Sequence, residues 1–349
     1  MKLTLASAGS YPRIGDTADW QLLRRTITAR DRGEKTPADV AQAEDKMVRA
    51  AVDDQSRAGL DVVTDGLIRW YDPISHLAGK LEGIEINGLL RFFDTNFYFR
   101  QPVIKGSPVR TGPLVVDEFQ FAQAASPKPV KPVLTGPYTL AKFSLVEFDG
   151  MKDLEARVMA FAEILAEELT ALEAAGAKLI QVDDPAAIKY TGDYAIFERG
   201  IHAMMLSWNS RRGLAGVNSP RAEGEARARH ARVALHLYFR DPGPLYYRLQ
   251  QLPVDILGVD FTYNPKFLEQ VQATGSSRPL ALGLVDGRNT KLERPEDLAR
   301  TLEKILPRLA GEECFLNPSC GLEYLPRDRA YAKLALLPQI REAVEGRQP

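Results

Sequence analysis

The chain has 349 residues, of which 45% are hydrophobic and 26% charged, and its formal net charge is −1. This composition is typical of a globular protein with a full core, and the length suits a large α/β barrel, a fold of about 250 residues that accepts insertions. The balanced charge gives no surface for nucleic acid or an acidic membrane, and no apolar run could span a bilayer. Two cysteines exclude a disulfide framework. We therefore expect a cytoplasmic enzyme.

Strand-like and helix-like patterns alternate along the chain. A strand is predicted over residues 2–7, followed by a helix over 38–58 and a second strand over 60–64. Aromatic and β-branched residues broken by turns then predict an antiparallel ribbon over about 90–113, outside the main sheet. Further strands are predicted at 131–135, 178–182, 233–238, 256–260, 280–284 and 314–316. Further helices are predicted at 154–175, 193–212, near 245, and at 266–273, 296–309 and 327–344.

About eight strands alternating with helices predict an α/β fold, a (β/α)8 TIM-type barrel with the ribbon as an insertion. No repeat or Gly/Ser linker divides the chain, so we expect a single domain over 1–349. In such barrels the active site lies at the C-terminal ends of the strands. The polar residues predicted at these ends are Ser10, Asp65, Thr135, Asp183, Asp184, His236, Asp260, Asp286 and Cys320.

Three of these residues have the chemistry of metal ligands. His236, Asp260 and Cys320 offer an imidazole, a carboxylate and a thiolate, a mixture that zinc accepts in sites with one open position. Such a position can bind a substrate thiol and hold it as the nucleophilic thiolate. Spacing alone leaves open that these are three unrelated polar strand ends. A lone cysteine such as Cys320 is also often a small buried apolar residue.

Four short motifs, in the same order along the chain, resemble the catalytic C-terminal barrel of cobalamin-independent methionine synthases. The motifs are Gly9-Ser10-Tyr11-Pro12, Thr135-Gly136-Pro137, Gln181-Val182-Asp183-Asp184-Pro185-Ala186 and Asn317-Pro318-Ser319-Cys320-Gly321-Leu322. The last is the most specific, because the family's zinc-binding cysteine lies in an Asn-Pro-x-Cys-Gly-Leu motif. The chain has no room for the family's long N-terminal half, so it is similar to the short, core-type members.

The resemblance implies methyl transfer to the sulfur of homocysteine, with zinc activating that sulfur. Cys320 and His236 match zinc ligands of the family, and Asp260 stands where the family has a zinc-associated glutamate. Ser10 matches the serine that helps to hold the carboxylate of the amino acid, and Asp183 matches the aspartate that pairs with its ammonium group. The small-molecule partners implied are a thiol such as homocysteine and a methyl donor, which is a methylfolate, a methylcorrinoid or a carrier protein.

The chain also departs from the family pattern. The family has His-x-Cys at the fifth strand, but here Tyr238 follows His236, so one expected thiolate is absent. Cys314 is not expected to replace it, because Cys314 lies near the start of the eighth strand. Leu67 follows Gly66 where the family has a glutamate, and Phe143 stands where the family uses a tryptophan against folate. These changes leave the fold prediction intact and weaken the prediction of the substrate.

We therefore predict a zinc-dependent methyltransferase whose acceptor is a thiol, with homocysteine as the first choice and methionine as the product. One alternative is a metal-free decarboxylase on the same barrel, for which Arg13, Arg69 and Arg240 are candidates to bind carboxylates. Another is a non-catalytic partner protein of a methyl-transfer system. Neither nucleic acid nor a membrane is expected as a partner.

Overall fold

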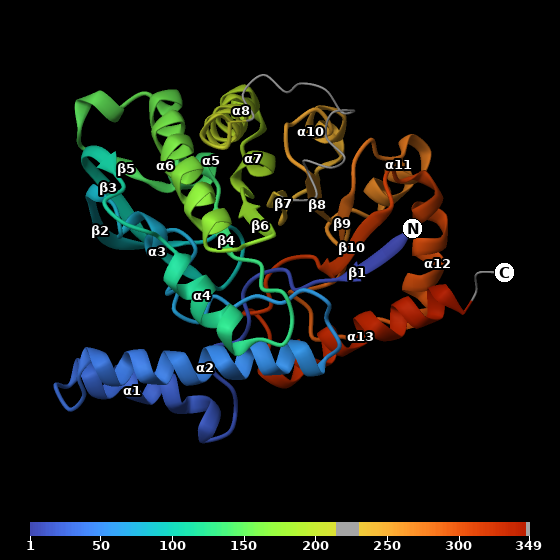
Figure 1. The fold of residues 1–349 in the computed structure, drawn as a ribbon, viewed down its shortest axis with the longest axis horizontal. Coiled ribbons are helices and arrows are strands. Elements are labelled where there is room, and N and C mark those ends of the chain that lie inside the picture. The colour runs from blue at the N-terminus through green and yellow to red at the C-terminus, as the bar shows by residue number, and fades with distance from the viewer. Residues whose placement is uncertain (214–229, 347–349) are drawn as a thin grey trace. The chain divides into compact units, whose positions relative to one another are not determined.

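The computed structural model describes residues 1–213 and 230–346. The chain forms two compact units. The first contains Met1–Trp70, Phe121–Val130 and Val259–Pro349, and the second contains Tyr71–Gln120 and Lys131–Gly258. Over the described residues, helices flank a parallel sheet of seven strands, which confirms the predicted α/β class (Figure 1). The single domain expected over 1–349 stays a prediction.

In the first unit, the first strand of the chain pairs with its last strand. The strands here are β1 (Lys2–Leu5), β9 (Leu280–Val285) and β10 (Glu313–Pro318). β10 runs parallel to both β1 and β9, and Leu3 lies opposite Cys314. Cys314 is thus at the start of its strand, as predicted. β10 continues to Pro318 instead of ending at Leu316, because the last position of a strand tolerates a residue without an N–H group.

Seven helical segments belong to the first unit. They are η1 (Asp19–Gln21), α1 (Leu22–Asp31), α2 (Pro37–Arg57), α11 (Pro265–Thr274), α12 (Pro295–Ile305), η5 (Leu306–Arg308) and α13 (Arg327–Glu345) within the described residues. α2 begins with a capping box, in which Thr36 and Asp39 satisfy each other's backbone N–H groups, and Pro37 occupies the first turn. In Figure 1, α1 lies beside α2.

The second predicted strand, over 60–64, is largely replaced by side-chain hydrogen bonding. The Asp61 carboxylate accepts a hydrogen bond from the Leu5 N–H at 2.8 Å, and the Asp61 N–H donates to the Leu5 carbonyl. A side chain therefore occupies a position that a strand backbone would fill. What remains is two single parallel bridges, Ala6 with Val62 and Val63 with Val130.

The second unit holds three strands of the parallel sheet. They are β4 (Val133–Thr135), β6 (Leu179–Asp183) and β7 (Arg232–Leu237), with β6 in the middle. The helical segments described here are α3 (Ser75–Ala78), α5 (Pro137–Phe143), η2 (Asp149–Met151), α6 (Leu154–Ala174), α7 (Ala186–Lys189), η3 (Thr191–Asp193), α8 (Tyr194–Arg211), η4 (Gly243–Leu245) and α10 (Tyr246–Leu249). α6 and α8 lie side by side (Figure 1).

Two elements contribute residues to both units. They are β8 (Ile256–Asp260) and α4 (Val116–Ala125). Every residue of β6 and β8 is buried, the pattern of strands covered on both faces. The polar residues in these strands, such as Gln181, Asp183 and Asp260, therefore lie in the interior.

The predicted ribbon is present in the second unit but begins earlier than expected. β2 (Glu82–Arg91) pairs antiparallel with β3 (Tyr98–Val109), and β5 (Leu145–Val146) adds to β3 in parallel. The sequence of β2 contains Gly83, Gly88 and two glutamates, which are poor strand formers, so its pattern gave no strand signal. β2 is an edge strand with mostly exposed residues, where such residues are tolerated.

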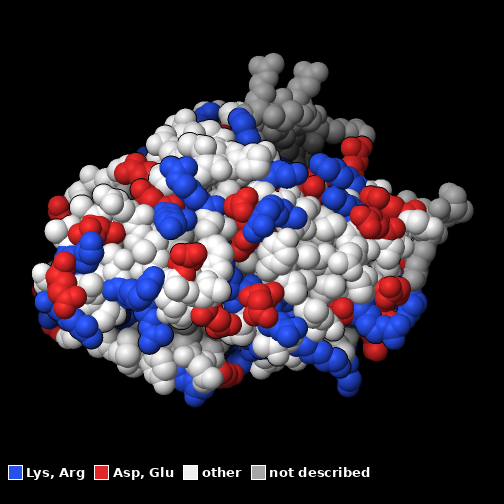
Figure 2. Space-filling model, turned by 90° about the horizontal axis from the view of Figure 1, so that it is seen from below, with Lys and Arg blue, Asp and Glu red and all other residues white. Residues whose placement is uncertain are grey.

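One face of the molecule carries acidic and basic side chains mixed together. On the face drawn in Figure 2, lysines and arginines are interspersed with aspartates and glutamates, and neither charge forms a continuous patch. In the described part of the chain, no helix is both long and apolar enough to cross a membrane.

Candidate active site

Three of the predicted strand-end residues form a row in the second unit. The register of the parallel strands pairs Thr135 of β4 with Asp183 of β6, and Asp183 with His236 of β7. Paired residues of parallel strands point to the same face of the sheet, so the three side chains lie next to one another. All three are buried.

The Asp183 carboxylate is held by two donors. Gln181 Nε2 donates to Oδ1 at 2.7 Å, and the Tyr238 hydroxyl donates to Oδ2 at 3.2 Å. Burial raises the pKa of Asp183 to about 7, although these hydrogen bonds and the positive charge of Lys131 act in the opposite direction. The carboxylate is thus poised to become fully ionised when a cationic group approaches it.

Asp184, the next residue, has a structural role. Its carboxylate accepts hydrogen bonds from the backbone N–H groups of Tyr138 and Thr139, at 3.2 and 2.7 Å, in the first turn of α5. A Cβ atom at Gly136 would lie 2.3 Å from Asp184 Oδ2, so the close approach requires glycine there. Burial raises the pKa of Asp184 to about 7 as well. Of the two adjacent aspartates, only Asp183 therefore faces the row of strand-end residues.

The His236 imidazole has an unsatisfied nitrogen. The residue is 4% exposed, and within the described chain its Nε2 atom has no hydrogen-bond partner. The ring lies against Gly258, where a Cβ atom would come within 2.5 Å of His236 Cδ2. Burial, and then the charge of Lys131, hold the pKa of His236 well below 6.5, so the ring is neutral at pH 7. A neutral imidazole with a free ring nitrogen is suited to bind a metal ion.

In the first unit, Ser10 meets the loop that follows β10. The Leu322 N–H donates to the Ser10 carbonyl at 2.8 Å. A Cβ atom at Gly321 would lie 1.9 Å from Ser10 Oγ, so any larger residue at position 321 would displace the hydroxyl. The motif Cys320-Gly321-Leu322 thus contacts the motif that contains Ser10.

Cys320 follows β10 on a loop, as predicted, but it is buried, with 2% exposure. Its thiol donates to the Gly321 carbonyl at an Sγ–O distance of 3.3 Å. Burial raises the pKa of Cys320 well above its ordinary value, and the negative charge of Asp260 adds to this effect. Asp260 is fully buried, and its Oδ1 accepts hydrogen bonds from the Thr262 N–H and hydroxyl. A thiolate at Cys320 would therefore require a nearby positive charge.

Gly283 of β9 allows the end of β8 and the loop after β10 to lie close together. A Cβ atom at Gly283 of β9 would lie 2.8 Å from the Ser319 Cα atom and 3.4 Å from the Asp260 Cα atom. The end of β8 and the residues after β10 therefore pack directly over the β9 backbone. This explains why the charge of Asp260 acts on Cys320.

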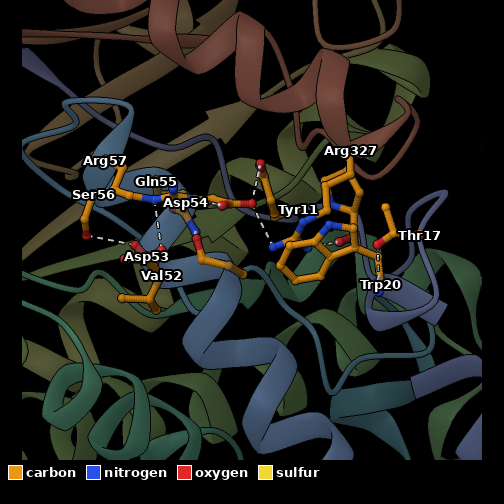
Figure 3. Close-up of polar contacts among 12 residues, drawn as sticks. Tyr11, Thr17, Trp20, Val52, Asp53, Asp54, Gln55, Ser56, Arg57 and Arg327 are labelled. Carbon is orange, nitrogen blue, oxygen red and sulfur yellow. Dashed lines mark hydrogen bonds and ion pairs between the residues drawn. The ribbon is translucent and has the colours of Figure 1, made fainter. Parts of the chain in front are cut away.

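A buried polar network anchors the loop that carries Ser10 (Figure 3). The Tyr11 hydroxyl donates to Asp54 Oδ2 at 3.2 Å, and Arg327 forms an ion pair with the same oxygen at 2.8 Å. Arg327 Nη1 also donates to the Pro12 carbonyl at 3.0 Å, and Arg57 pairs with Asp54 Oδ1 at 2.7 Å. Arg327 of α13 and Asp54 of α2 thereby hold the two residues that follow Ser10.

Two of the other predicted strand-end residues serve local turns. The Asp65 carboxylate accepts a hydrogen bond from the Leu67 N–H at 3.0 Å, and the Asp286 carboxylate accepts one from the Arg288 N–H at 2.9 Å. Leu67 has a left-handed backbone, with a φ of 51°. These contacts are typical of turn aspartates and do not by themselves indicate chemistry.

Among the described residues, no three histidine, cysteine, aspartate or glutamate side chains are arranged so that they could hold a metal ion. The structure thus joins Asp183 with His236 in the second unit, and Cys320 with Asp260 and Ser10 in the first. The assignment of a metal site stays a prediction.

Lys131, Gln181 and Tyr238 were not predicted as site residues. Gln181 and Tyr238 bond to Asp183, and Lys131 is 2% exposed with its pKa lowered to about 8 by burial. The alternation of side chains along β6 could have revealed Gln181, because residues 181 and 183 share a face. The register that pairs Thr135 with Asp183 is not readable from the sequence.

Comparison with known proteins identifies relatives over nearly the whole chain. Residues 3–343 match the family described as the catalytic domain of cobalamin-independent synthase. A methionine synthase of Saccharolobus solfataricus is 32% identical over 329 residues, which cover 93% of this chain and 90% of that protein. A methionine synthase of Sulfurisphaera tokodaii is 31% identical, with coverage of 93% and 88%.

Solved structures share the fold. The B12-independent methionine synthase of a Shewanella species, solved in complex with selenomethionine, matches with a TM-score of 0.77 at 21% identity, over 99% of this chain and 98% of that one. A putative vitamin-B12 independent methionine synthase of Listeria monocytogenes matches with a TM-score of 0.70 at 17% identity, over 100% of both chains. The likeness confirms the predicted (β/α)8 TIM-type barrel.

Proposed function

Because this chain belongs to the family of cobalamin-independent synthase catalytic domains and is a methyltransferase of that type, we propose that it transfers a methyl group to the sulfur of homocysteine and so forms methionine. The observation that carries the proposal is the contact between Ser10 and the Cys320-Gly321 loop. In this contact the Ser10 hydroxyl, which would bind the carboxylate of the amino acid, lies next to the loop of Cys320, which would act at the sulfur of the substrate.

Asp183 would bind the ammonium group of the amino acid. Gln181 and Tyr238 use one lone pair on each oxygen of its carboxylate, which leaves others for an incoming cation. Its pKa of about 7 means that a fraction of the carboxyl groups is protonated at neutral pH when no ammonium group is bound. The ammonium group would favour the ionised form.

His236, Asp260 and Cys320 would hold a zinc ion. The unsatisfied Nε2 atom of His236 supports this, and so does the interaction between the charges of Asp260 and Cys320. Nitrogen, oxygen and sulfur donors together suit zinc better than magnesium or calcium. Bound zinc would supply a Lewis acid that keeps the acceptor sulfur in the thiolate form. The three side chains must be brought together by the ion, since no such group is already formed among the described residues.

The methyl donor would be a methylated pterin, a methylcorrinoid or a methylated carrier protein. The acceptor sulfur forms a bond to the methyl carbon while the bond from that carbon to the donor breaks, and the donor leaves with the electron pair. The protein would hold the sulfur and the methyl group in line. Such positioning removes a large part of the activation free energy of a bimolecular reaction. Ser10 and Asp183 would fix the amino acid for this purpose.

The metal-free decarboxylase is less well supported. That reaction requires arginines available to bind several carboxylates. Arg69 instead forms an ion pair with Asp45, and Arg240 forms one with Asp94 at 2.6 Å. Two of the three candidate arginines are thus paired with carboxylates of the protein itself.

The proposal is tested by supplying homocysteine with each of the three donor types and measuring methionine by mass spectrometry. Protein purified without chelator is analysed for metal in parallel. We expect methionine from one donor and about one zinc per chain, both lost in His236→Ala and Cys320→Ala. His202→Ala, at an exposed histidine of α8, is the matched control and should retain both. Absence of methionine with every donor, from protein that binds no zinc, would reject the proposal and favour the decarboxylase.

A further inference from the structure

Tyr238, at the position where the chain departs from the family pattern, contacts Asp183. The Tyr238 hydroxyl donates to Asp183 Oδ2 at 3.2 Å, while Gln181 donates to Oδ1. Without such donors, the carboxylate of an aspartate can take a wide range of angles about its terminal torsion. With a separate donor on each oxygen, the plane of the Asp183 carboxylate is fixed.

The ring of Tyr238 is itself held in place. Its centroid lies 4.6 Å from that of Phe239, with the two planes 80° apart, the edge-to-face arrangement that aromatic rings favour. Phe239 packs in turn on Phe93 at 5.3 Å and on Phe92 at 6.2 Å. Phe93 also contacts Phe143, which replaces the family's tryptophan. All these residues belong to the second unit.

The backbone at this cluster is strained. Phe239 has a φ of 72° and Phe93 a φ of 52°, and both values lie in the left-handed region that bulky residues rarely adopt. Strain of this kind persists only where the surroundings determine the position of the residue, and it concentrates at functional sites. Here the two strained residues contact each other and support the ring of Tyr238.

The direction of the hydroxyl argues against a role as metal ligand. A tyrosine ligates metal ions as the phenolate, which cannot donate a hydrogen bond, whereas the Tyr238 hydroxyl is engaged with Asp183 Oδ2 at 3.2 Å. Ligation would therefore cost this hydrogen bond and leave one oxygen of the buried carboxylate without its donor.

We infer that Tyr238 is a positioning residue for the amino-acid substrate, which orients the Asp183 carboxylate toward the ammonium group, and that it does not replace the missing cysteine as a metal ligand. This inference rests on the proposed function. The rings of Phe239, Phe93 and Phe143 would then serve to hold the Tyr238 hydroxyl against Asp183.

The test removes only the hydroxyl. In Tyr238→Phe we expect the Kd for methionine, measured by calorimetry, and the KM for homocysteine to rise about tenfold, as for loss of one hydrogen bond to a charged group. The zinc content and kcat should stay within about twofold of the wild type, because neither involves the hydroxyl. Tyr247→Phe is the matched control, since Tyr247 is 79% exposed, and it should change none of these values.

A double-mutant cycle separates positioning from a general structural effect. In an Asp183→Asn background, Tyr238→Phe should cause little further loss of methionine affinity, because the ionised carboxylate that it orients is gone. A twofold or smaller effect of Tyr238→Phe on methionine binding, or loss of zinc from that variant, would overturn the inference while leaving the proposed function intact. Wild-type protein that binds neither methionine nor homocysteine would overturn both.

Discussion

Burial determines the pKa values of individual residues in the candidate site. Asp183 and Asp184 both have a pKa of about 7 for this reason, yet only Asp183 is bonded to the side chains of Gln181 and Tyr238. The Asp184 carboxylate instead accepts hydrogen bonds from backbone N–H groups in the first turn of α5. Of the two aspartates, only Asp183 should therefore alter ligand binding when it ionises.

Methionine affinity should rise with pH through neutrality. An ammonium group binds the ionised carboxylate, and with a pKa of about 7 the ionised fraction of Asp183 increases roughly tenfold between pH 6 and pH 8. Calorimetric titrations across this range should show a corresponding rise of the association constant. The groups that face Asp183, Lys131 and Tyr238, remain in the wild type and in Asp183→Asn. In that variant the pH dependence should become weaker, leaving only the contribution of Lys131, whose pKa burial lowers to about 8. A slope as steep as that of the wild type would contradict the assignment.

Gly258 should be required for metal binding although it offers no ligand. In Gly258→Ala, the new Cβ atom would lie within 2.5 to 2.7 Å of three atoms of the His236 ring, so the imidazole must move. We expect zinc affinity to fall by about 10-fold to 100-fold, the range seen when groups that orient a ligand are lost. Gly192→Ala is the control, because a Cβ atom at Gly192 meets nothing within 4 Å. Unchanged zinc binding in Gly258→Ala would argue against His236 as a ligand.

At the scale of elements, helices α2 and α13 determine where the loop that carries Ser10 lies. Asp54 is 5% exposed and Arg327 is 5% exposed, and they meet at Tyr11, directly after Ser10. A buried ion pair contributes little relative to an apolar pair of the same shape, but removal of Arg327 would leave the buried Asp54 carboxylate with only the exposed Arg57 as its cation. The network should thus be intolerant of single substitutions.

Arg327→Ala should lower the free energy of unfolding by about 3–5 kcal/mol, the usual effect of removing one partner of a buried ion pair. Denaturation in guanidinium chloride measures this. Arg329→Ala, in the same turn of α13, removes an ion pair between exposed side chains and should change stability by less than about 0.5 kcal/mol. Equal effects of the two substitutions would mean that the buried network does not hold the loop.

For the whole molecule, bound zinc should increase stability by mass action. A ligand that binds only the native state at a thousand times its Kd adds about 4 kcal/mol. Removal of the ion with a chelator should therefore lower the midpoint of thermal unfolding, and zinc, but not magnesium, should restore it. Cys320→Ala should unfold at the same temperature with and without chelator. A chelator-sensitive Cys320→Ala protein would place the metal elsewhere.

Much of the fold was predictable, because apolar patterns and caps act locally. β8 was predicted with its observed bounds, and α6 to within one residue. Most of β2 was missed, because its glycines weaken the strand pattern. The strand over 60–64 was predicted but is largely absent, because the Asp61 side chain bonds where a strand backbone would. The contact of Tyr238 with Asp183 was not predictable, because it depends on how β6 and β7 align and on the backbone turn at the following residue.

The anchoring of the Ser10 loop has a consequence for synthesis on the ribosome. The Pro12 carbonyl bonds to Arg327, 315 positions later, and the Thr4 hydroxyl bonds to Glu313, 309 positions later. At about 5–20 residues per second, the ribosome needs roughly 15–60 s to make the partners of the first strand. The loop that carries Ser10 is therefore among the first segments to emerge and among the last to be fixed, because its partner Arg327 lies in α13.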